Sequence, residues 1–214
     1  MIFRFAVAAA CSVLGILAGA AAAQAHPHVW VTVRGEVVYG PSGAPTALRF
    51  AWTFDEAFSI FSAQGLDTNN DGKLSREELA PLAEVNVSSL KEFDYFTFGK
   101  SGEVKIEFSE PVDYWLAIDE QKLLTLHFTL PVKAAPKGAF SFEVYDPSYF
   151  IAFDLGEDTP FKLTGAPAGC ALEAKKPEPM TTATGRLSEQ FFNSLTASSR
   201  YGSQFANRIA VRCP

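Results

Sequence analysis

Side chains that carry oxygen recur at alternate positions at the start of residues 67–78, a segment that reads DTNNDGKLSREE. Oxygen atoms are the ligands of hard cations, and a Ca²⁺ ion takes roughly six to eight of them. The spacing matches a twelve-residue calcium loop of the EF-hand kind. The predicted calcium ligands are Asp67, Asn69, Asp71, Lys73 through its backbone carbonyl, Ser75 directly or through water, and Glu78 with both oxygens.

The residues between and around these ligands fit the same interpretation. Gly72 occupies the position of the sharp turn, and Leu74 is placed to turn its side chain inward. The alternative is an Asx-rich turn that binds no ion. Because no second loop of this kind is present, and because calcium is plentiful outside the cytoplasm, we expect the loop to stabilise the fold and not to act as a switch.

A second candidate metal site depends on export of the chain. Residues 1–25 begin with one positive charge at Arg4, continue through an apolar run from Phe5, and end in Ala23-Gln24-Ala25. This pattern predicts a secretory signal peptide cleaved after Ala25 and a periplasmic location. A retained membrane anchor is the alternative, because the apolar run has about the length of a minimal span.

Cleavage after Ala25 would leave the amino terminus His26-Pro27-His28. The free α-amine and the imidazole of His26 can then chelate one transition-metal ion, and His28 would share a face with His26 in an extended strand. Pro27 has no amide proton, which excludes a square-planar site made of deprotonated backbone amides. Amine and imidazole ligands suit Zn, Cu, Ni or Co. The alternative is a frayed polar terminus that binds no metal.

Other groups could complete or compete with this transition-metal site. His127 lies in the alternating segment Leu123 to Leu130, where a lone histidine is more often a packed residue than a ligand. Asp55 and Glu56 could add a carboxylate, although paired acids at such a position usually begin a helix. The sequence alone leaves the convergence of these groups open.

The cysteines are expected to be structural. The chain has three, and cleavage of the signal peptide would remove Cys11, where attachment of lipid is disfavoured by its place halfway along the apolar run. Cys170 and Cys213 would then form a disulfide in an oxidising compartment. A two-cysteine metal site is the alternative.

Charge argues against nucleic acid and anionic lipid as partners. The whole chain has 18 basic and 24 acidic residues and a formal charge of −6, and loss of Arg4 makes it one unit more negative. We expect no stable membrane insertion after cleavage.

Alternating hydrophobicity predicts that strands dominate the chain. A hairpin is expected from His28 to Phe54, with a turn at residues 40–43, and further strands follow at intervals. The expected strands are His28–Tyr39, Leu48–Phe54, Val104–Phe108, Tyr114–Ile118, Leu123–Leu130, Phe140–Tyr145, Tyr149–Leu155 and Arg208–Val211.

Helical spacing appears in two segments that flank the calcium loop, Asp55–Leu66 and Arg76–Phe93, so that a helical insert spans about residues 55–95. A polar loop is expected over Lys175–Thr184 and a short helix over Ser188–Ser198. The predicted fold is therefore α+β and mainly β. It is a single domain over residues 26–214, with an antiparallel sandwich-like body, an EF-hand insert and a short C-terminal helix.

Four motifs, HPHVWV, WTFDEAFS, LDTNNDGKLSREEL and YDPSYFIAF, resemble in that order a bacterial family catalogued as domain of unknown function 1007. The resemblance covers residues 26–170, and the segment after Cys170 is not aligned. It implies a periplasmic component associated with NicO-type nickel/cobalt membrane transporters. It also implies that His26, His28 and His127 are the histidines the family shares.

We therefore expect a periplasmic metal-binding protein that carries or hands over a transition metal, and not an enzyme. No nucleophile elbow, zinc-protease helix or phosphate loop is present, and Ser148 has no catalytic partner beside it in the sequence. The alternatives are a copper-dependent redox enzyme with a histidine-brace site and a structural module that calcium makes rigid.

Overall fold

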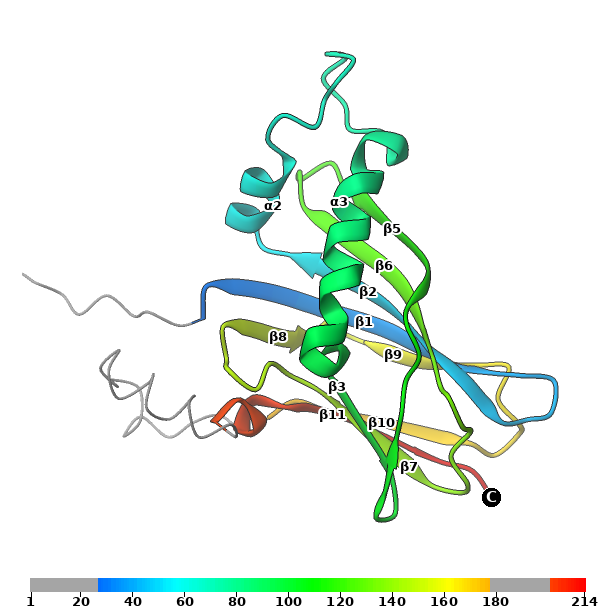
Figure 1. The fold of residues 1–214 in the computed structure, drawn as a ribbon. Coiled ribbons are helices and arrows are strands. Elements are labelled where there is room, and N and C mark those ends of the chain that lie inside the picture. The colour runs from blue at the N-terminus through cyan, green and yellow to red at the C-terminus, as the bar shows by residue number, and fades with distance from the viewer. Residues whose placement is uncertain (1–26, 178–200) are drawn as a thin grey trace, which may run out of the picture.

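The computed structural model describes residues 27–177 and 201–214, and the strands in these ranges form two sheets (Figure 1). The first sheet contains, in spatial order, β5 (Val112–Ile118), β6 (Leu124–Pro131), β2 (Pro45–Phe54), β1 (Val29–Tyr39) and β8 (Ile151–Leu155), and β9 (Phe161–Thr164) also pairs with β1. The second contains β10 (Ala171–Lys175), β11 (Asn207–Arg212), β7 (Phe140–Val144), β3 (Thr97–Ser101) and β4 (Val104–Ile106).

Strand direction is antiparallel except around β1. β1 and β2 form the expected hairpin, whereas β8 and β9 both run parallel to β1 and pair with successive parts of it. The α+β, mainly β fold class is confirmed, and the parallel pairs make the first sheet mixed where the sequence predicted an antiparallel body. β8 follows β7 of the second sheet in the chain, so it joins β1 through a crossover connection and not through a hairpin.

The core lies between the two sheets. Alternate residues of β1, β2 and β6 are buried, as the period of a strand requires, and the largest of them are aromatic. The ring of Phe50 in β2 meets Phe142 in β7 edge-on, with 6.5 Å between centroids. The ring of Phe161 in β9 lies 5.5 Å from Phe142, again at a steep angle. These contacts join the sheets into a sandwich, as predicted.

The insert between β2 and β3 contains α2 (Glu56–Ala63), α3 (Arg76–Ser89) and the 3-10 segment η1 (Leu90–Phe96). Both helices begin at capped residues. Asp55 accepts a hydrogen bond from the backbone of Phe58, and Ser75 forms a reciprocal capping box with Glu78. α3 packs against β5, and Figure 1 shows it crossing in front of the strands of the first sheet.

α3 is tied to the sandwich core by residues spaced four apart. Leu79, Ala83 and Val87 are buried in the core cluster, which is the face that a helix of period 3.6 presents to one neighbour. The helix predicted over Arg76–Phe93 is shorter in the structure, since α3 ends at Ser89. The 3-10 segment η1 follows, and in it Asp94 and Tyr95 adopt positive φ.

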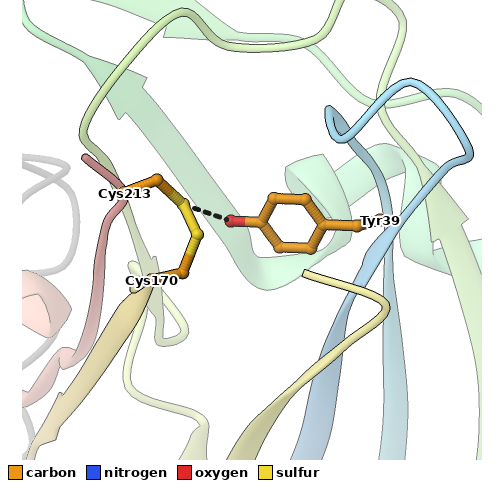
Figure 2. Close-up of a disulfide and its surroundings, with 3 residues drawn as sticks. All are labelled: Tyr39, Cys170 and Cys213. Atoms are coloured by element: carbon orange, nitrogen blue, oxygen red, sulfur yellow. Dashed lines mark hydrogen bonds between the residues drawn. A yellow bond between two sulfur atoms is a disulfide. The ribbon is translucent and has the colours of Figure 1, made fainter. Parts of the chain in front are cut away.

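The disulfide between Cys170 and Cys213 is present, with a sequence separation of 43 residues (Figure 2). It lies beside the β10–β11 ladder, whose first pair joins Ala171 to Arg212. The Tyr39 hydroxyl oxygen lies 3.4 Å from Sγ of Cys213. Because a disulfide sulfur has no proton, Tyr39 is the donor, and this bond links the end of β1 to the second sheet. Burial raises the pKa of the Tyr39 phenol.

Three strands were absent from the expectation, namely β3, β9 and β10. The predicted loop Lys175–Thr184 begins inside β10, which ends at Lys175. Its remaining residues beyond 177, the predicted helix Ser188–Ser198 and the predicted signal peptide all lie outside the described residues. Across 27–177 and 201–214, no helix is both long enough and apolar enough to cross a membrane.

Candidate functional site

The predicted calcium loop connects α2 to α3 and projects from the end of the sandwich in Figure 1. Its side-chain oxygens accept hydrogen bonds from backbone amides of the same loop. Asp67 accepts hydrogen bonds from the amides of Asp71 (3.2 Å) and Gly72 (3.0 Å). Asn69 accepts from the Asp71 amide at 2.8 Å, and Asp71 accepts from the Lys73 amide at 2.8 Å. These bonds hold the turn in its conformation.

Glu78 closes this loop from the first turn of α3. One carboxylate oxygen accepts from the amide and hydroxyl of Thr68, at 2.8 and 3.0 Å, and from the amide of Asn69 at 3.3 Å. The other accepts from the amide and hydroxyl of Ser75, both at 2.9 Å. Hydrogen bonds from the Ser75 backbone and side chain, with those from Thr68, lower the pKa of Glu78 to about 2. The carboxylate is therefore charged at any physiological pH.

The donor set of the loop fits a hard cation. Every predicted ligand offers oxygen, the ligand type that Ca²⁺ prefers, and Gly72 has the positive φ of 78° that the sharp turn requires. In this conformation the acidic oxygens bond to amides, and no group of three His, Cys, Asp or Glu side chains within the described ranges is arranged around a metal position.

His28 lies where the chain enters β1, and its side chain is exposed. Its amide donates a hydrogen bond to the carbonyl of Phe150 at 2.9 Å, and its ring lies 4.7 Å from the Phe150 ring. The backbone of His28 is thereby fixed to the segment that leads into β8. His26, the other predicted ligand at the terminus, lies outside the described residues.

The turn that presents Phe150 is organised by a buried carboxylate. Asp146 is 4 % exposed and accepts hydrogen bonds from the Ser148 amide (2.8 Å), the Ser148 hydroxyl (2.8 Å) and the Ile151 amide (2.9 Å). The Ser148 hydroxyl is thus committed to the turn. Sequence reasoning did not assign Asp146 a role, although the run Asp146-Pro147-Ser148 is typical of a side-chain-stabilised turn.

His127 lies in the middle of β6 and is half-buried. Its ring stacks on Trp115 of β5, with 4.6 Å between centroids and an interplanar angle of 10°. The guanidinium of Arg76 lies 4.7 Å above the Trp115 ring. Burial, together with the positive charge of Arg76, lowers the pKa of His127 and favours the neutral imidazole.

The register of the first sheet does not bring His127 to the amino terminus. His127 pairs with Ala51, and Ala51 pairs with Arg34. His28 precedes Arg34 by six positions, a separation of about 20 Å along the strand at roughly 3.3 Å per residue. Two imidazoles that share an ion must each place a nitrogen at about 2 Å from it. The expectation that His28 and His127 act as ligands of one site is therefore not supported by the structure.

Both carboxylate oxygens of Asp55 also make structural hydrogen bonds. One of its carboxylate oxygens accepts from the amide of Phe58 at 2.9 Å, and the other accepts from the amide of Trp30 at 2.8 Å. It caps α2 and ties that helix to β1, in keeping with the reading of a helix start. The carboxylate that could have been added to the terminal histidines is thus engaged with two backbone amides.

Comparison with known proteins agrees with the resemblance seen in the sequence motifs. The family described as "Protein of unknown function (DUF1007)" matches residues 11–213. An uncharacterized protein of Haemophilus influenzae is 20% identical over 195 residues, which cover 88% of this chain and 91% of that protein. The family match extends past Cys170 to Cys213, so it includes the segment that the motifs left unaligned.

Proposed function

The chain belongs to the DUF1007 family, whose function is unknown, and we propose that this member is an exported metal-binding protein. The observation that carries the proposal is the loop at residues 67–78, where predicted ligands are held on one short turn by their own hydrogen bonds. Glu78 stands at the closing position and is anchored on α3. A loop of this construction suits Ca²⁺.

We assign the calcium loop a stabilising role. Asp67 follows α2 and Glu78 lies in the first turn of α3, so ligands from both ends of the loop would join the two helices through one ion. α3 is already held to the core by Leu79, Ala83 and Val87, whereas the loop itself is exposed. The ion would therefore order the exposed end of the insert against the fixed helix.

We further propose that the mature amino terminus carries a transition metal, Zn, Cu, Ni or Co. The α-amine and imidazole of His26 and the imidazole of His28 are the ligands. Support comes from His28, which is exposed and whose backbone is fixed by Phe150. Because the register keeps His127 away, this chain would leave coordination positions open at the metal. Open positions suit hand-over to a partner, for which we propose a NicO-type membrane transporter.

The test of the terminal site compares the exported protein, beginning at His26, with a form that has one extra residue before His26. The extension moves the α-amine away but keeps both imidazoles, so affinity should fall about 10-fold or more, which corresponds to over 1.4 kcal/mol. His28→Ala should cost a similar factor. His127→Ala is the matched control, and its affinity should equal that of the unaltered protein, because His127 lies elsewhere in the sheet.

Competition titrations with Zn²⁺, Cu²⁺, Ni²⁺ and Co²⁺ give the readout. If the extended form binds all four ions as tightly as the native form, the amine is not a ligand and the terminal site is wrong. A loss of affinity in His127→Ala as large as that in His28→Ala would contradict the separation of the two histidines.

A further inference from the structure

A pocket opens on the outer face of the first sheet, away from the sandwich core. It lies where β1 begins and β2 leads into α2, and its volume is about 620 Å³. Its base includes Thr32 of β1 and Thr53 of β2, which are partners in the β1–β2 ladder. Its sides include Trp30, Glu56 in α2 and Gln121 in the turn before β6. The volume falls within the range of roughly 300–1,000 Å³ that is typical of pockets for small molecules.

Trp30 gives this pocket an exposed aromatic side. Buried and exposed residues alternate at the start of β1, and Trp30 belongs to the exposed set, with 48 % of its surface open to solvent. Its backbone is fixed, since its amide donates a hydrogen bond to the Asp55 carboxylate at 2.8 Å and its carbonyl accepts one from the Asp55 amide at 2.9 Å. The indole therefore offers a flat apolar surface on a rigid strand, against which a ligand can stack.

Three polar side chains of the lining do not use their hydrogen-bonding groups within the described protein. The Thr32 hydroxyl, the Glu56 carboxylate and the Gln121 amide make no hydrogen bond or ion pair with any described residue. In contrast, the Thr53 hydroxyl lies 2.9 Å from the hydroxyl of a threonine on β6, and each Asp55 oxygen accepts from a backbone amide. The pocket therefore offers a ligand a free carboxylate, a hydroxyl and an amide beside an aromatic ring.

The charge of the lining disfavours one class of ligand. Asp55 and Glu56 are its ionisable residues, and the described part of the chain contributes no lysine, arginine or histidine to it. A bound anion would therefore meet two carboxylates and no compensating cation, which is unfavourable at short range. The ligand has to offer hydrogen-bonding groups without negative charge and, for the indole, a face made of C–H groups. An uncharged sugar ring combines these properties, because hydroxyls project from its rim and its axial C–H groups can meet the negative face of the indole.

We propose that this pocket binds one ring of an uncharged sugar, stacked on the indole of Trp30. A hydroxyl of the sugar donates to the Glu56 carboxylate, and such a charge-assisted hydrogen bond is stronger than a neutral one. The Thr32 hydroxyl and the Gln121 amide can each donate and accept, which matches the dual capacity of sugar hydroxyls. The site is independent of metal binding, since neither His28 nor any residue of the calcium loop lines the pocket.

The test titrates the exported, ¹⁵N-labelled protein with the methyl glycosides of glucose, galactose, mannose and N-acetylglucosamine. At least one glycoside should bind at a single site per chain and shift the indole N–H signal of Trp30. In Trp30→Ala, binding followed by saturation-transfer NMR should weaken about 10-fold or more, because the stacking surface is lost. The matched control is Phe61→Ala, because Phe61 is an aromatic residue of α2 that is 74 % exposed and does not line the pocket.

Further comparisons test the chemistry of the ligand. Thr32→Val keeps the shape of the side chain but removes its hydroxyl and should weaken binding several-fold, whereas Thr129→Val on the same face of the sheet should not. The uronic acid that corresponds to the tightest-binding glycoside should bind at least about 10-fold more weakly, because its carboxylate meets Glu56. Glu56→Gln should reduce this difference. Choline is the cationic comparator, because an indole beside a carboxylate can also hold an ammonium group.

Several results would overturn the proposal. Absence of binding by all of the glycosides would show that the pocket is not a sugar site. Equal binding by Trp30→Ala and Phe61→Ala would place the sugar elsewhere on the surface. Tighter binding of choline than of any glycoside would make the pocket an ammonium site, and a uronic acid that binds as tightly as its glycoside would contradict the role of charge. Unfolding midpoints of each variant verify the fold, and if Trp30→Ala is unfolded, the comparison of Thr32→Val with Thr129→Val decides.

Discussion

Replacement of Cys170 and Cys213 with serine should lower the free energy of unfolding by about 4 kcal/mol. The bond closes an interval of 43 residues. In the chain-entropy model, an unfolded loop of that length loses roughly 13 cal/mol/K when it is closed, which gives the stated value at 25 °C. The native fold should persist without the bond, because β11 stays paired with both β10 and β7.

The expected shift in the thermal midpoint follows from the size of the protein. A domain of this size changes its midpoint by about 2–4 °C per kcal/mol, so the double variant should melt roughly 8–16 °C lower. Tyr39→Phe removes only the hydrogen bond from the phenol to Cys213 and should cost no more than about 1–2 kcal/mol. This variant separates the contribution of the phenol from that of the covalent bond.

Urea denaturation gives the test at equilibrium. The double variant should show a lower midpoint and a slightly larger m-value, because its unfolded chain expands further. The unaltered protein should resist alkylation until it is reduced. Free thiols in exported protein would contradict the pairing, and equal midpoints for the oxidised and serine forms would refute the entropic reasoning.

Two further predictions concern charged groups. Glu78→Gln should abolish the rise in thermal midpoint that calcium produces, because an ion that binds only the folded state adds about 2.7 kcal/mol at 100 times its dissociation constant. The calcium-free midpoint should also fall, because a glutamine has one accepting oxygen and cannot accept hydrogen bonds from both Thr68 and Ser75. An equal midpoint in calcium and in chelator for the unaltered protein would count against the loop. The imidazole of His127 should titrate below its ordinary pKa of 6.5, as proton NMR can record. Its contribution to stability is then present above pH 6.5 and lost as the pH falls through the lowered folded-state pKa. His127→Gln should flatten this dependence, and superimposable stability profiles for the two proteins would contradict it.

The sequence predicted those parts of the fold that depend on short-range pattern. β1, β2 and β6 were identified because alternate residues are buried against a second sheet, and α3 because its apolar residues recur at helical spacing, which is a local pattern. β9 and β10 are short, with four and five residues, and carry few alternating apolar positions. Their strand conformation depends on ladders to β1 and β11, which are distant in sequence.

The two metal sites differ in the same way. The calcium loop is contiguous, so its ligand spacing could be read directly from residues 67–78. The distance between His28 and His127 depends on the register of three strands, which the sequence does not give. Two residues on the same face of a sheet can still lie six positions apart along the strands.

The metal content of the exported protein with its native amino terminus tests the central claim most directly. Elemental analysis after equilibration with calcium and zinc and removal of unbound ions should find about one of each per chain. The extended amino terminus should lose zinc and keep calcium, and Glu78→Gln should lose calcium and keep zinc. Neither metal above the level of the buffer in the unaltered protein would contradict the proposal that this is a metal-binding protein.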